Sequence, residues 1–199
     1  MREEQSTFDW RRYGHWDSST EKARLCAFLL WSTQDQDRLG ALIGDGSYNN
    51  GDAGLALWEG FRRESAVALE LIVKAVVAKR LELRRAPTSD RVPATHDLPA
   101  LWAAAGLPAL PREDQYRLLL FKSVLLWSGR YATPRSAKAW AEENAALRTL
   151  DNPAVRVGKL RFSKPTTYDW DDFDRLYQTA KARLLSLERE SAASHGSEM

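Results

Sequence analysis

The chain has 199 residues, of which 44% are hydrophobic, and these values predict a packed globular domain rather than a disordered polypeptide. The 29 basic residues nearly balance 27 acidic ones, so the formal charge of +2 does not by itself indicate a polyanionic partner. One cysteine and three scattered histidines exclude an internal disulfide and the usual multi-cysteine zinc site, and we expect neither a metal nor a cofactor.

The N-terminal part of the chain predicts an arm followed by a first helix. Residues 1–17 are polar with interleaved aromatic side chains, so we expect a short arm. The run Ser18-Ser-Thr-Glu21 has the pattern of a capping box, which predicts a helix from about 21 to 43. Apolar residues recur there at helical spacing, and Cys26 among them is predicted to be a buried, unreactive thiol. The first members of this face are Leu25, Phe28 and Leu29.

The second predicted helix is the longest and forms the spine of the fold. We expect it to run from Asp52, its N-cap, to about Arg84, because Pro87 blocks continuation. Glu70 and Lys74 lie one turn apart in the favourable orientation. They form either an ion pair at the solvent edge or a buried pair that lines a pocket. The predicted inward face comprises Leu55, Trp58, Phe61, Ser65, Leu69, Ile72 and Val76.

Two further helices are predicted between the prolines that follow. Thr95 and Asp97 are expected to cap a short helix that has Pro99 in its first turn and ends at Gly106, with His96 packed or hydrogen-bonded beside the cap. The next helix is expected at 112–127. Its predicted inward residues are Tyr116, Leu119, Leu120, Val124 and Trp127.

Residues 130–166 have the least regular pattern of the chain. The part from 137 to 150 is compatible with a helix. The part from 154 to 164 alternates apolar and basic residues, which is typical of a strand, but an ordered extended loop explains it equally well. A last helix is expected from Trp170 to about Glu190, capped by Asp169. Its stripe is Phe173, Leu176, Tyr177, Ala180, Leu184 and Leu187.

These patterns specify an all-α bundle of about five helices in a single domain at 1–190, with an irregular excursion at 136–166 and a disordered tail at 191–199. The N-terminus lacks an apolar targeting core, and charged residues interrupt every apolar run well before the ~20 residues needed to span a bilayer. We therefore expect a cytoplasmic protein that does not enter a membrane.

One stretch of the chain resembles a known family. It holds an apolar helix at 64–78, the turn Thr95-His96-Asp97-Leu98, and a second apolar helix that ends in Trp127-Ser-Gly-Arg-Tyr-Ala-Thr-Pro134. This order resembles the HEPN families, which are helical bundles linked to RNA cleavage and nucleotide binding in microbial defence. The resemblance implies a dimer and partners such as RNA, a nucleotide or another protein.

The resemblance also identifies candidate site residues. RNA-cleaving HEPN proteins carry an arginine and, about five residues later, a histidine; here Arg130 is followed by Tyr131 and no histidine. The resemblance therefore implies a non-catalytic or degenerate binding or interaction module in a stress, toxin–antitoxin or phage-defence setting. Arg130 either contacts a ligand phosphate or satisfies carbonyls at the helix end, and Tyr131 either joins it or anchors the turn.

Two alternatives stay open. The chain is a metal-independent endoribonuclease if Arg130 stabilises phosphate while His96 or a partner chain supplies the base. Arg91 precedes His96 at the nuclease spacing, but Pro93 disfavours a helix between them, so we interpret this match as chance. The other alternative is a structural accessory subunit of a nucleotidyltransferase.

A basic run near the last helix is the candidate nucleic-acid surface. It contains Arg156, Lys159, Arg161 and Lys164, and the aromatic residues Phe162 and Tyr168 lie close to it in sequence. Basic residues interleaved with stacking groups suit single-stranded nucleic acid. A solvated loop explains the run equally well.

Overall fold

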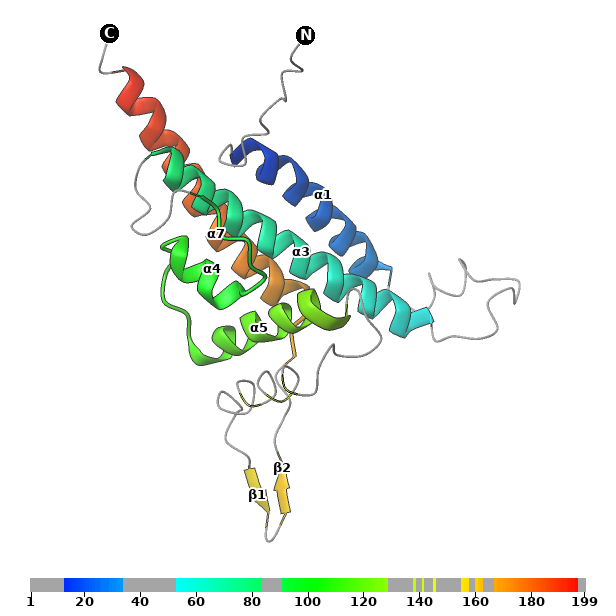
Figure 1. The fold of residues 1–199 in the computed structure, drawn as a ribbon. Helices are drawn as coiled ribbons and strands as arrows, with labels where there is room; N and C mark the ends of the chain where they lie inside the picture. Colours follow the sequence, from blue (N-terminus) through cyan, green and yellow to red (C-terminus); the bar gives the residue numbers. More distant parts are fainter. Residues whose placement is uncertain are drawn as a thin grey trace, which may run out of the picture.

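The computed structural model describes residues 13–33, 53–83, 91–128, 155–157, 160–162 and 167–196, and the helical positions 138, 141 and 145. Its elements are α1 (Tyr13–Ser32), α3 (Ala53–Glu82), α4 (Leu98–Ala104), α5 (Arg112–Ser123), the π-helical turn η1 (Val124–Ser128), β1 (Val155–Val157), β2 (Leu160–Phe162) and α7 (Trp170–Gly196). Helix α3 contacts all the other described helices, with α1 and α7 along its length and α4 and α5 beside it (Figure 1). The all-α bundle is thus confirmed.

Helix α3 forms as its apolar pattern predicts. Phe61, Leu69, Ile72 and Val76 are each 0% exposed, and the helix ends at Glu82, close to the expected end. Its N-terminal turn differs, because Leu55 is 53% exposed. The continuous burial of the second half of α3 follows from its position between several helices.

The prediction for α1 is wrong in its start and its orientation. The helix begins at Tyr13, so residues 18–21 lie inside it and form no capping box. Thr20 is 0% exposed, and its hydroxyl donates to the Ala68 carbonyl at 2.9 Å. The buried apolar residues of α1 are small, Ala23 and Ala27, which permit close helix packing. Larger residues pack beside them, since Trp31 contacts Trp58 and Phe61 of α3.

Three larger apolar residues of α1 are exposed instead. Leu25, Phe28 and Leu29 are 57%, 44% and 53% exposed. Cys26 is also exposed, so the prediction of a buried thiol is wrong. Gly60 of α3 leaves room for Leu30 of α1, since a Cβ at Gly60 would lie 3.3 Å from the Leu30 side chain. Residues 34–43 of the predicted helix and residues 1–12 of the predicted arm lie outside the described residues.

The segment around α4 agrees with its sequence signals. Asp97 Oδ1 accepts a hydrogen bond from the Ala100 N–H at 3.2 Å, and Thr95 Oγ1 accepts one from the Asp97 N–H at 3.1 Å. Gly106 ends the helix with φ +63°, a left-handed conformation that disfavours side chains. The two predicted caps of α4 are confirmed.

Helix α5 is rotated relative to the prediction. Leu118, Phe121 and Leu125 are buried at helical spacing, whereas Tyr116, Leu119 and Leu120 are only partly buried. Asp114 begins the buried face because it forms an ion pair with α7. Val124 is buried as predicted, and the Trp127 side chain lies outside the described residues.

Helix α7 has the predicted cap and face. Asp169 Oδ1 accepts a hydrogen bond from the Asp172 N–H at 2.9 Å, and all six stripe residues are buried. The helix continues to Gly196, beyond the expected end at Glu190. None of the helices in the described part of the chain is long and apolar enough to cross a membrane.

The alternating segment forms an antiparallel hairpin rather than an extended loop. β1 pairs with β2 so that Arg156 lies opposite Arg161. The alternating pattern therefore predicted strands correctly. The partner of β1 is β2, which begins three residues after β1 ends. Most of the remaining 130–166 segment lies outside the described residues.

Candidate functional site

The Glu70–Lys74 pair lies in the interior of the bundle. Both residues are 7% exposed, and Lys74 Nζ lies 2.5 Å from Glu70 Oε1. The interpretation as a solvent-edge pair is therefore wrong. The pair is buried, as the alternative had it, but neither residue lines the cavity described below. Burying two charges is costly unless each is paired and hydrogen-bonded, so their surroundings matter.

His96 joins this pair from the turn before α4. Its Nδ1 lies 3.1 Å from Glu70 Oε1 and 3.0 Å from Oε2, although the residues are 26 positions apart. A carboxylate only accepts hydrogen bonds, so this contact selects the tautomer with a proton on Nδ1. The His96 side chain is 38% exposed, and Nε2 is on the opposite side of the ring. Nε2 is therefore the ring nitrogen that does not contact Glu70.

Two neighbours stabilise the cluster of Glu70, Lys74 and His96. The ammonium of Lys74 lies 5.5 Å from the centre of the Trp16 ring, a cation–π distance. Lys122 of α5 binds Asp97 Oδ2 at 2.8 Å, which fixes the residue after His96. Burial alone would raise the pKa of Asp97, but hydrogen bonds from Lys122 and the Ala100 N–H hold it below its usual value. Sequence reasoning missed both neighbours, because Trp16 fell in the predicted arm and Lys122 has no local signal.

The structure describes the other candidate residues only in part. Arg91 is exposed, and the segment that joins it to His96 is not helical, so the two do not share a helix face. Arg130, Tyr131, Lys159 and Lys164 lie outside the described residues. Within the described ranges, no group of three or more His, Cys, Asp or Glu side chains is placed to hold a metal ion.

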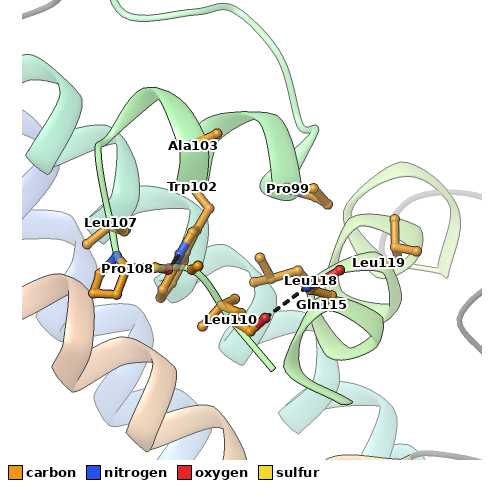
Figure 2. Close-up of a pocket in the computed structure, with 10 residues that line it drawn as sticks. Pro99, Trp102, Ala103, Leu107, Pro108, Leu110, Gln115, Leu118 and Leu119 are labelled. Carbon is orange, nitrogen blue, oxygen red and sulfur yellow. Dashed lines mark hydrogen bonds between the residues drawn. The ribbon is translucent and has the colours of Figure 1, made fainter. Parts of the chain in front are cut away.

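An apolar cavity lies between α4 and α5 (Figure 2). It has a volume of about 430 Å³, and Trp102, Leu110 and Leu118 are part of its wall. Its polar groups are bound to the backbone: Trp102 Nε1 donates to the Pro108 carbonyl at 2.8 Å, and Gln115 Nε2 donates to the Leu110 carbonyl at 2.8 Å. The cavity therefore suits an apolar group. Glu70, Lys74 and His96 are not among its lining residues.

Comparison with known proteins assigns no family to the chain, since no family model, no curated protein and no solved structure matches it. The fold and the site together define an all-α bundle in which a buried carboxylate holds a partly exposed histidine.

Proposed function

We propose that this chain is a HEPN-like helical module that binds RNA or a nucleotide without cleaving it. The observation that carries the proposal is the contact between His96 Nδ1 and the buried Glu70 carboxylate. The long helix and the Thr-His-Asp-Leu turn are both parts of the HEPN resemblance, and their side chains meet in one cluster. Because Glu70 fixes the ring, a protonated His96 can donate from Nε2 to a ligand phosphate.

Binding without cleavage is favoured because the cluster offers few groups for chemistry. Transesterification of RNA needs one group to move a proton and another to stabilise phosphate charge. Lys74 is already paired with Glu70 at 2.5 Å, so its charge is largely compensated. The partner protein and homodimer remain proposals, supported by the exposed side chains of Leu25 and Leu29 on α1.

Binding of labelled single-stranded and transfer RNA tests the proposal. We expect His96→Ala to weaken binding about tenfold, as for the loss of one charge-assisted hydrogen bond. Arg189→Gln, an exposed position on α7, should leave affinity unchanged. Circular dichroism of each variant separates lost binding from lost folding. Equal affinity of wild type and His96→Ala would refute a role for this cluster.

The same contact favours one other function, a metal-independent endoribonuclease. A neutral His96 with its proton on Nδ1 has Nε2 free to act as a base, and a carboxylate partner stabilises the imidazolium that forms. Arg130 would then stabilise the phosphate. Cleavage that persists in EDTA and is lost in both His96→Ala and Arg130→Ala would establish this enzyme and overturn the non-catalytic proposal.

A further inference from the structure

The walls of the cavity between α4 and α5 are fixed by hydrogen bonds (Figure 2). Trp102 of α4 and Gln115 of α5 each donate to a backbone carbonyl of the segment that connects the two helices. Just before α4 begins, Asp97 binds Lys122 of α5 at 2.8 Å. These bonds tie α4, the connecting segment and α5 together. A ligand would therefore meet a site that is already formed, as is usual for small-molecule sites.

The floor of the cavity is buried, and part of its rim is open to solvent. Trp102, Leu107 and Leu118 form the floor and are 4%, 8% and 2% exposed, whereas Ala103 and Ala109 on the rim are exposed. Water in the cavity meets an apolar floor, so its release into bulk solvent favours an apolar ligand. The volume of about 430 Å³ lies within the range of about 300–1,000 Å³ that is typical of small-molecule sites.

The lining disfavours charged ligands and peptides. None of its 10 residues carries a charge, so an ionic group would lose its hydration there without gaining a charged partner. Trp102 Nε1 and Gln115 Nε2 already donate to backbone carbonyls. Few side-chain groups are therefore left for the N–H and C=O groups of a peptide, which need partners when they are buried.

We infer that this cavity binds a small, uncharged molecule built from aromatic rings. Trp102, Pro99 and Pro108 give the cavity flat and rigid surfaces, and an aromatic ring packs well against an indole. A rigid ring system also loses less conformational freedom on binding than a flexible acyl chain does. The inference does not rest on RNA binding, which is proposed for His96, a residue outside the lining.

Two fluorescent probes with the same ring system test the inference. N-phenyl-1-naphthylamine is uncharged, and 8-anilino-1-naphthalenesulfonate is the same molecule with one added sulfonate group. Both fluoresce more strongly in apolar surroundings, so titration of the full chain gives their affinity and stoichiometry. We expect one uncharged probe to bind per chain, about tenfold or more tightly than the sulfonate, because the lining offers no charge to replace the water around an anion.

Two variants that fill the cavity locate the bound probe. Ala103→Leu enlarges a rim residue of α4, and Ala109→Leu enlarges one in the connecting segment. Both positions are exposed, so neither change adds volume to the core. Each should weaken binding of the uncharged probe about tenfold or more. Ala192→Leu, the same change at an exposed position of α7, is the matched control and should leave the affinity unchanged. Thermal unfolding checks that each variant is folded.

Every other outcome would overturn the inference. The cavity is not the site if the uncharged probe does not bind, if both filling variants bind it as tightly as wild type, or if the control loses as much affinity as they do. Equal affinity for the sulfonate would contradict the uncharged class of ligand. If wild type self-associates in sedimentation velocity and both filling variants are monomeric, the cavity is an interface between two copies of the chain instead. RNA binding should be unchanged in both filling variants, so failure of this inference leaves the proposed function standing.

Discussion

Asp114 on α5 accepts two hydrogen bonds from the guanidinium of Arg175 on α7, at 2.5 and 2.8 Å. Asp114 is 2% exposed and also accepts a bond from Arg117 at 2.8 Å. Arg117 in turn reaches Asp172 of α7 at 3.0 Å. These bonds join two helices far apart in sequence, and they explain why α5 turns an acidic residue inward.

The Asp114 network predicts a loss of stability in acid. Burial alone would raise the pKa of Asp114, but hydrogen bonds from Arg175 and Arg117 outweigh it and lower the pKa below 3.8. The native state therefore binds fewer protons than the unfolded state, so the contribution is fully present above about pH 4 and is lost as pH falls through the lowered pKa. Urea unfolding between pH 2 and 6, roughly the range around carboxyl titration, measures this loss.

Asp114→Asn should reduce that acid dependence and lower the unfolding free energy at neutral pH by about 2–3 kcal/mol, because Arg175 and Arg117 lose a charged acceptor. Asp171→Asn is the matched control, since Asp171 is an exposed acid in the first turn of α7. An Asp114→Asn protein with wild-type acid dependence would show that the network does not contribute.

Tyr177 predicts a loss of stability in alkali. Burial raises its pKa to about 12, against an ordinary value of 10.0. Between these values the native state keeps a proton that the unfolded state releases, so stability falls as pH rises above 10, by about 2–3 kcal/mol in total. Tyrosinate absorbance should show that Tyr177 and Tyr168, whose pKa is also raised by burial, ionise at a higher pH than an ordinary tyrosine. Tyr177→Phe should flatten the decline; an unchanged profile contradicts the prediction.

The buried face of a helix was predicted correctly from the sequence where the buried side chains are large. Helices α3 and α7 were predicted well, because Phe61, Leu69 and Phe173 are both large and fully buried. Helix α1 was oriented wrongly, because Ala23 and Ala27 form its buried face while Leu25 and Leu29 are exposed. A pattern method that ranks side chains by size gives too little weight to buried alanines.

The candidate site was only partly predictable for a different reason. The spacing of Glu70 and Lys74 predicted their pairing, because partners one turn apart are neighbours on any helix. Their burial and the approach of His96 depend on how the turn before α4 packs against α3. Such tertiary contacts leave no local periodicity. The pairing of β1 with β2 likewise links two segments, so the alternating pattern of either segment alone does not specify it.

Substitution of Gly106 is expected to lower the unfolding free energy more than substitution of most glycines. Its φ is +63°, and an added Cβ would lie 2.5 Å from Arg80 Nη1. That guanidinium donates to the Ala104 carbonyl at 2.7 Å, so it cannot move without losing a bond at the end of α4. Gly106→Ala should lower the unfolding free energy by about 1–2 kcal/mol. In contrast, Gly14→Ala in α1, with no neighbour within 4 Å, should stabilise by roughly 0.5 kcal/mol. Equal effects in chemical denaturation would contradict this account.

Thr20 and Ser18 distinguish the observed helix start from the capping-box pattern. Thr20 is buried against α3 and donates to Ala68 at 2.9 Å, whereas Ser18 is exposed inside α1. Thr20→Val should cost about 1 kcal/mol, because the carbonyl of Ala68 loses a buried donor. Ser18→Ala should change stability by less than about 0.5 kcal/mol. A cap at Ser18 would reverse this order, so thermal unfolding of the two variants separates the alternatives.

Cys26 provides a chemical test of how α1 is oriented. The thiol is exposed and lies between Leu25 and Phe28 on the outer side of the helix. A thiol reagent should therefore modify the native protein at a rate close to that of the urea-unfolded chain, because no opening of the bundle is required. An Ala23→Cys/Cys26→Ser variant places the thiol at a position that is 8% exposed and should react far more slowly. If native Cys26 were protected and the position-23 thiol were reactive, α1 would present its larger apolar residues to α3 instead, as the spacing of those residues first suggested.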